Sequence, residues 1–189
     1  MVTIYSTATT LDGFLATPDN SLDWLFEVPG SDEAESGVVD FLAGVGAMAM
    51  GSTTYEWVVD HESLVEKPEN WSAWYADRPT WVFTHRELPV VKGADIRFTQ
   101  SPVAEVHAEM LQAAGGKDIW LMGGGDLVGQ FADAGLLDRI TATIAPVTLG
   151  TGAPLLPRQI LASRLTLTAV EQRGQFAELT YAVGPVATT

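Results

Sequence analysis

The sequence predicts an α/β protein whose mostly parallel central sheet carries helices on both faces and antiparallel strands at its C-terminal end. Two patterns lead to this fold class. Apolar strand-like runs alternate with amphipathic helical segments up to about residue 140, an order typical of parallel strands joined by helices. Beyond residue 140 the segments are all strand-like, which indicates antiparallel neighbours at one edge of the sheet.

The length and composition fit a single domain over residues 1–189. A chain of 189 residues can bury a sizeable core. A hydrophobic fraction of 47% with a charged fraction of 18% excludes a disordered chain. No linker, internal repeat or low-complexity tract divides the sequence.

In the first half of the chain, short loops separate strand patterns from helix patterns. Ser, Thr and Asp favour helix starts because their side-chain oxygens accept hydrogen bonds from first-turn amides. Residues 60–79 are tryptophan-rich and predicted to be irregular. The other expected elements are a buried strand over 2–8, a loop over 10–20, a helix from Ser31 or Asp32 to Ala43, a strand over 47–50, and a helix from Ser52 or Thr53 to Val59.

In the second half, the strands become longer and the helices fewer. Gly174-Gln175 between two apolar runs is the best hairpin signal of the chain. The expected strands cover 80–84, 96–99, 119–122, 139–149 with a break at Pro146, 165–173 and 176–183, and the expected helices cover 103–113 and 126–134.

Charge and composition exclude several classes of function. A formal net charge of −14 argues against nucleic acid and against an anionic membrane surface as partners, since both require a basic face. The absence of cysteine excludes disulfides and thiolate metal sites, a zinc deaminase centre among them, and the three histidines are scattered. For these reasons we expect no metal. We also expect a cytoplasmic protein, because no leader pattern or membrane-length apolar run is present.

The most informative segment is Asp118–Phe131, where an apolar strand pattern meets three glycines and a helical pattern begins at once. Glycines 123–125 leave their backbone amides unshielded by any Cβ atom. These amides would lie at the positive end of the following helix dipole. The segment therefore predicts a site for an anion such as the pyrophosphate of a nucleotide.

Common nucleotide and hydrolase motifs do not explain this segment. Gln130-Phe131 stands where a P-loop requires Lys and Ser or Thr, and the spacing differs from the G-x-G-x-x-G fingerprint. No G-x-S-x-G nucleophile elbow occurs in the chain.

Several segments in this order resemble the dihydrofolate reductase superfamily. They are Thr9–Ala16 after the first strand, Gly51–Glu56 between a strand and a helix, the triple glycine, Gly135–Asp138, and Ala145–Gly152. The chain looks closest to the branch that contains the reductase domain of the riboflavin-biosynthesis deaminase–reductase. The resemblance covers residues 2–183 and implies a dihydrofolate-reductase-like three-layer fold.

The resemblance also implies an activity. It points to an NADPH-dependent reductase of a pyrimidine- or pterin-like heterocycle, similar to 5-amino-6-(5-phosphoribosylamino)uracil reductase. Members of this branch often form homodimers through their sheets, so we expect a homodimer that contacts through the strand-rich C-terminal third.

The resemblance assigns the cofactor site to four segments. Backbone groups of the first loop would hold the carboxamide, the Gly51 helix start a phosphate, the 84–86 segment the 2′-phosphate, and the triple glycine the pyrophosphate. Ser52 stands where the family commonly has an arginine, which weakens the expected preference for NADPH over NADH. The implied residues are Ala8, Leu15, Ala16, Gly51, Ser52, Thr53, Thr54, Thr84, His85, Arg86, Met122, Gly123, Gly124, Gly125, Asp126 and Leu127.

Substrate residues are less defined by the resemblance. Glu35 is the nearest match to the acid that folate reductases carry on their first helix. Asp12, Trp24 and Arg158 are the candidate substrate residues. Each has a plainer interpretation: Glu35 as a solvated carboxylate, Asp12 as a turn residue, Trp24 as core packing, and Arg158 as a surface charge.

Other functions remain open from sequence. A true dihydrofolate reductase is the first alternative, and an NADP(H)-binding protein without this catalysis is the second. A flavin-dependent reductase is a further one.

Overall fold

The computed structural model describes residues 1–186, with the side chains of residues 31–36 left out of that description. The strands are β1 (Thr3–Thr10), β2 (Phe14–Ala16), β3 (Val45–Gly51), β4 (Thr80–Phe83), β5 (Ile96–Thr99), β6 (Asp118–Gly123), β7 (Arg139–Ala145), β8 (Ala153–Pro154), β9 (Leu165–Arg173) and β10 (Phe176–Val183). The helices are α1 (Asp23–Phe26), α2 (Ser31–Ala43), α3 (Ser52–His61), α4 (Glu69–Tyr75), α5 (Val103–Ala113) and α6 (Gly125–Asp133).

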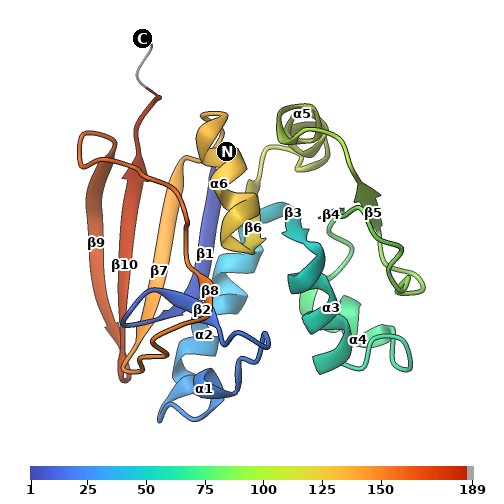
Figure 1. Ribbon diagram of the computed structural model, residues 1–189. Coiled ribbons are helices and arrows are strands. Elements are labelled where there is room, and N and C mark those ends of the chain that lie inside the picture. Colours follow the sequence, from blue (N-terminus) through green and yellow to red (C-terminus); the bar gives the residue numbers. More distant parts are fainter. Residues whose placement is uncertain (187–189) are drawn as a thin grey trace.

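Eight strands form one central sheet in the order β5-β4-β3-β6-β1-β7-β10-β9 (Figure 1). The strands from β5 to β7 pair in parallel, whereas β10 runs antiparallel to both β7 and β9. The predicted fold class is therefore confirmed, including the antiparallel strands at the C-terminal end. Strands β2 and β8 form a separate two-stranded pair.

Alternation along the central strands divides the core between the two faces of the sheet. Tyr5 and Leu121 pack with α5 and α6 on one face. Met48 and Met50 pack with α3 and α4 on the other face, where Phe41 of α2 joins them. The molecule thus has three layers, with the sheet between two sets of helices.

Differences between the expected and the observed elements have local causes. Residues 60–79 contain α4, whose apolar Trp71 and Tyr75 lie on one helical face and pack into the core. The strand predicted over 139–149 ends at Ala145, because Pro146 has no amide to donate to the sheet. Helix α2 starts at Ser31 after Gly30, which adopts a left-handed conformation (φ 84°) and takes the cap position expected for Ser31 or Asp32.

A buried histidine makes the stability of this fold depend on pH. His107 of α5 lies 2.8 Å from the Thr3 hydroxyl through Nε2, and burial lowers its pKa below the ordinary value of 6.5. Because His107 binds a proton more readily in the unfolded chain than in the folded protein, the folded state loses stability as pH falls below about 6.5. Urea unfolding is expected to give a lower free energy at pH 5.5 than at pH 7.5. His107→Gln should flatten this difference; an unchanged pH slope would contradict the assignment.

Within residues 1–186, no helix has both the length and the apolar character needed to cross a membrane.

Candidate active site

Two helices begin side by side at the carboxyl ends of two central strands. Helix α3 follows β3 and helix α6 follows β6, and these two parallel strands are direct neighbours. Their cap residues are Gly51 and Gly124, and neither helix has a side-chain cap. The chain leaves β3 toward β4 and leaves β6 toward β7 on the other side, so the two ends define a topological switch point. Such crevices at the carboxyl ends of parallel strands are the usual ligand sites of α/β sheets.

The three consecutive glycines differ in whether the protein requires a residue without a Cβ atom at that position. Gly123 has a positive φ of 134°, which residues with a Cβ atom rarely adopt. A Cβ atom on Gly125 would lie less than 3.0 Å from the carbonyl oxygens of Pro154 and Leu155. A Cβ atom on Gly124 would meet no described atom within 4 Å. Only Gly124 is thus free of steric demands from the protein and faces open space.

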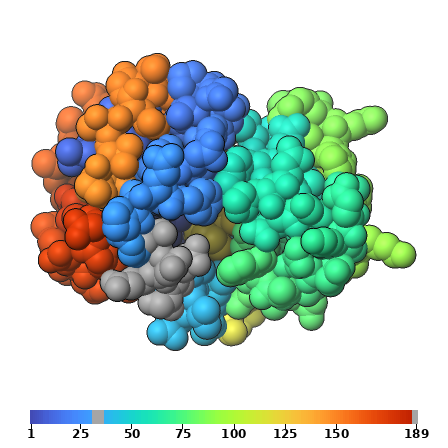
Figure 2. All heavy atoms as spheres, turned by 90° about the horizontal axis from the view of Figure 1, so that it is seen from below, coloured from blue at the N-terminus to red at the C-terminus, as the bar shows by residue number. Residues whose placement is uncertain are grey.

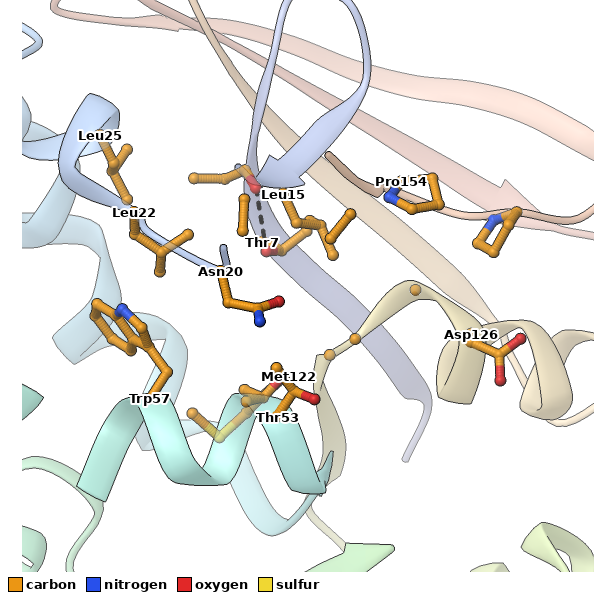
Figure 3. Close-up of a pocket in the computed structure, with 18 of the residues that line it drawn as sticks. Thr7, Leu15, Asn20, Leu22, Leu25, Thr53, Trp57, Met122, Asp126 and Pro154 are labelled. Atoms are coloured by element: carbon orange, nitrogen blue, oxygen red, sulfur yellow. Dashed lines mark hydrogen bonds between the residues drawn. The ribbon is translucent and has the colours of Figure 1, made fainter. Parts of the chain in front are cut away.

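A cavity of about 360 Å³ adjoins this corner and is largely apolar. Figure 3 shows Thr53 at the start of α3, Met122 beside it, and Leu15 and Leu22 on the opposite wall. Seen from below, the surface is hollowed between the blue N-terminal segment and the teal residues of α3 (Figure 2). Ten of the residues implied by the resemblance line this cavity: Ala8, Leu15, Ala16, Thr53, Thr54, Met122, Gly123, Gly124, Gly125 and Asp126.

The negative charge of Asp126 near the corner is partly balanced by Arg158. Its carboxylate points away from the centre of the cavity (Figure 3) and lies 3.1 Å from the Arg158 guanidinium. Arg158 also pairs with Asp133 at 2.8 Å and lies against Gly129. The structure therefore places Arg158 along α6, outside both cavities, where it pairs with two carboxylates of that helix.

The other implied cofactor residues lie around the corner. A Cβ atom on Gly51 would lie 3.7 Å from the Gly124 amide nitrogen, so the two helix starts are in close contact. Ser52 is the first residue of α3. The side chain of Leu127 packs in the core, and only its amide, in the first turn of α6, remains for a ligand.

The segment expected to hold a 2′-phosphate follows β4 at the same edge of the sheet. The Thr84 hydroxyl accepts a hydrogen bond from the Arg86 amide and so shapes the turn. The Arg86 guanidinium forms a bidentate pair with Glu56 of α3, at 2.9 and 2.6 Å. His85 is exposed. Arg86 is thus paired with Glu56 and would have to release this carboxylate to bind a phosphate.

Asp12 serves the loop that follows β1. Its carboxylate accepts hydrogen bonds from the Thr10 hydroxyl and from the amides of Gly150 and Leu149, and these bonds lower the pKa of the carboxyl. The structure brings Asp12 to neither cavity. Its hydrogen bonds instead hold the 10–16 loop, which walls the first cavity, against the segment after β7.

A second cavity of about 640 Å³ lies beneath α1 and α2. It contains polar side chains from three neighbouring strands, among them Thr141, Thr143 and Glu178, together with Arg173 from the end of β9. The two cavities meet along six shared residues: Thr7, Ala8, Leu22, Leu25, Trp57 and Met122.

Aromatic rings border the junction of the two cavities. Trp57 stacks on His61 one turn later in α3, with ring centroids 4.4 Å apart. His61 stacks in turn on Phe26 of α1 at 5.2 Å. Trp24 is buried and lines the first cavity, whereas Trp71 lies in the core and Trp74 is half exposed. Of these four tryptophans, Trp24 and Trp57 line a cavity.

Glu35, the proposed acid, lies outside the described side chains, although its backbone belongs to α2. The sequence interpretation missed Arg173, Glu178, Thr141 and Thr143. The alternation of Thr141, Thr143 and Glu178 with other residues along β7 and β10 was visible, but the same pattern is typical of a sheet face exposed to water. Arg173 lies at the end of β9.

The parallel sheet, its switch point and the adjoining cavities define the class of dihydrofolate-reductase-like α/β proteins. The chain belongs to the RibD C-terminal domain family, whose model matches residues 2–177. This membership indicates a reductase-like protein related to riboflavin biosynthesis.

Individual relatives agree with this class. The uncharacterized protein YwjB of Bacillus subtilis is 31% identical over 179 residues, which cover 95% of this chain and 96% of YwjB. A putative riboflavin biosynthesis protein from Shewanella sp. PV-4 has a TM-score of 0.75 at 26% identity, covering 97% of this chain and 99% of the other. Dihydrofolate reductase from Enterococcus faecalis, complexed with NADP(H), has a TM-score of 0.63 at 15% identity, covering 96% of both chains, and supports the fold alone.

Proposed function

We propose that the protein is an NADPH-dependent reductase of a pyrimidine- or pterin-like heterocycle. The observation that carries this proposal is the pair of uncapped helix starts at Gly51 and Gly124, beside an apolar cavity that continues into a second cavity with more polar side chains. The first-turn amides of both helices lack intrahelical acceptors, and both dipoles favour an anion at the same corner. A diphosphate bridge fits this donor set.

The two cavities divide the tasks of such a reductase. The bound nicotinamide would supply a hydride. The apolar wall from Leu15, Leu22 and Met122 would keep water from the ring, and Ala8, which lines both cavities, would let the ring and the substrate approach each other because its side chain is small. The protein's own contribution is alignment of two flat rings in a dry space. The proton donor stays a proposal, with Glu35 of α2 as the candidate.

The choice of NADPH over NADH rests on Thr84, His85 and Arg86. Arg86 can reach a 2′-phosphate only by releasing Glu56, and Ser52 offers a hydroxyl rather than a guanidinium. We therefore propose NADPH as the cofactor with a modest preference over NADH. Pairing of two copies through the C-terminal strands also stays a proposal; the edge strand β9 exposes Leu167 and Val170.

Two titrations test the function. Because Trp57 lines both cavities, NADPH is expected to quench tryptophan fluorescence saturably. NADPH absorbance should then fall with the phosphoribosylamino-pyrimidine, or with dihydrofolate if the protein is a true dihydrofolate reductase. Binding without turnover of either substrate would favour a binding protein. Absence of NADPH binding, or a soaked crystal with the Gly124 corner empty, would remove the proposal.

A further inference from the structure

One face of the sheet is unusually polar where a helix covers it. On the side of β1, β7 and β10 that lines the second cavity, Ser6 pairs with Thr141, Thr141 pairs with Thr180, and Thr143 pairs with Glu178. Side chains between a sheet and a covering helix are normally apolar, as they are beside β3 and β6 on the same side. Here hydroxyls and a carboxylate line a cavity instead, so this face is suited to a polar ligand.

On that face, Arg173 and Glu178 form an ion pair. Arg173 donates through Nη2 to Glu178 at 3.2 Å and to Glu171 at 3.0 Å. The Thr143 hydroxyl donates to the second oxygen of Glu178 at 3.3 Å. Because Glu178 is held from two sides and its side chain is only 19% exposed, its orientation toward the cavity is preorganised.

Arg173 retains a donor without an acceptor. Its Nε–H is buried and has no hydrogen-bond partner among the residues that the structure describes. A buried donor left unpaired destabilises the folded protein, so such groups usually have a partner in the working state of a protein. Arg173 lines the second cavity, and a shift of its guanidinium toward that cavity would let a ligand supply the acceptor.

Helix α2 leaves room for this guanidinium. Gly37 lies in its interior, where glycine is less favourable than alanine. A Cβ atom at this position would lie 2.8 Å from Nη1 of Arg173. The glycine therefore allows Arg173 to lie between the sheet and the helix.

We propose that Arg173 and Glu178 position the substrate by reading a lactam edge, in which a ring carbonyl adjoins a ring N–H. Arg173 donates to the carbonyl and Glu178 accepts from the N–H. An anionic group is disfavoured at this pair, because the guanidinium already carries two carboxylates. Thr143, which holds Glu178, is paired in register with Ala8 of both cavities. A ring held there lies next to the proposed nicotinamide cavity, so this assignment rests on the proposed function.

A matched pair of probes tests the edge itself. 5,6-Diaminouracil carries ring N–H groups beside carbonyls, whereas 1,3-dimethyl-5,6-diaminouracil keeps the carbonyls and lacks those N–H groups. Calorimetric titration without cofactor is expected to show roughly tenfold tighter binding of the unmethylated probe, the scale of one well-placed hydrogen bond to a charged group. Glu178→Gln and Arg173→Met should each reduce this ratio to near one.

Controls separate positioning from a structural role. Arg97→Met removes an exposed arginine paired with Asp95, far along the sheet in β5, and should leave the ratio unchanged. Thr143→Val removes only the hydroxyl that holds Glu178 and should lower the ratio in part, even if the larger substitutions prevent folding. Thermal unfolding and NADPH titration of each variant report general damage, which would weaken both probes equally.

The outcomes are distinct from those of the reductase proposal. If the wild-type protein binds neither probe, binds both equally, or keeps its ratio in Glu178→Gln, the lactam assignment is overturned. If the ratio behaves as expected while no heterocycle drives NADPH oxidation, the assignment of the edge stands and the reductase proposal fails.

Discussion

Replacing Gly125 by alanine is expected to destabilise the protein by about 3 kcal/mol and to lower its melting temperature by roughly 6–12 °C. The added Cβ atom would lie less than 3.0 Å from the carbonyl oxygens of Pro154 and Leu155. Both obstacles are backbone atoms, so no side-chain rotation relieves the clash, and either α6 or the β8 segment has to move. Since both segments line the first cavity, NADPH binding should weaken as well.

Gly44→Ala provides the matched control for this substitution. Gly44 has φ −83° and ψ −13°, which alanine adopts easily, and its added Cβ atom would lie 3.5 Å from the nearest carbonyl oxygen. We expect the free energy of unfolding to change by about 0.5 kcal/mol or less, and the melting temperature to change little. Equal stability of the Gly125→Ala and Gly44→Ala proteins in urea unfolding would show that the close approach at Gly125 is relaxed in solution.

The second large effect is expected at Thr53, which lies at the N-terminal end of α3 beside the glycine corner (Figure 3). Thr53→Asp should weaken NADPH binding on the order of 30- to 100-fold, because a carboxylate beside a bound diphosphate would cost about 2–3 kcal/mol near a protein surface. The same carboxylate should stabilise the folded protein by about 0.3–1 kcal/mol, since an acid in the first turn favours the helix dipole.

The opposite signs make this substitution diagnostic. General damage lowers both stability and binding, whereas an anion site predicts higher stability with weaker binding. Thr53→Asn has nearly the shape of the aspartate without its charge, and should retain NADPH affinity within a few-fold. Fluorescence titrations at low and moderate salt measure the effect. Unchanged affinity in Thr53→Asp would exclude the corner as the diphosphate site.

Much of the fold could be predicted because it depends on local patterns. The bounds expected for β5, α5, β9 and β10 agree with the structure. Their apolar periodicity and the Gly174 turn suffice to define them. Helix α4 was missed because its seven residues are too few for a periodic pattern, and its stability comes from Trp71 in the core.

The candidate site was predictable only in part. The triple glycine and the Gly51 helix start are local signals, and the structure brings them together because β3 and β6 are neighbours. The roles of the three glycines were not separable from sequence, since the demand at Gly125 comes from Pro154 and Leu155, about 30 residues away along the chain. Arg158 looked available for a substrate, but only the folded chain shows its pairing with Asp126 and Asp133.

By itself, the sequence determined the α/β class and the antiparallel C-terminal strands, and it predicted a single domain and an anion site at the glycine corner. Each of these depends on residues close together in the chain, where periodicity, backbone freedom and helix dipoles act locally. Only the tertiary structure decided which polar residues share a cavity. Thr143, Arg173 and Glu178 look like an ordinary solvent face until α2 covers them, because burial depends on which distant segments pack together.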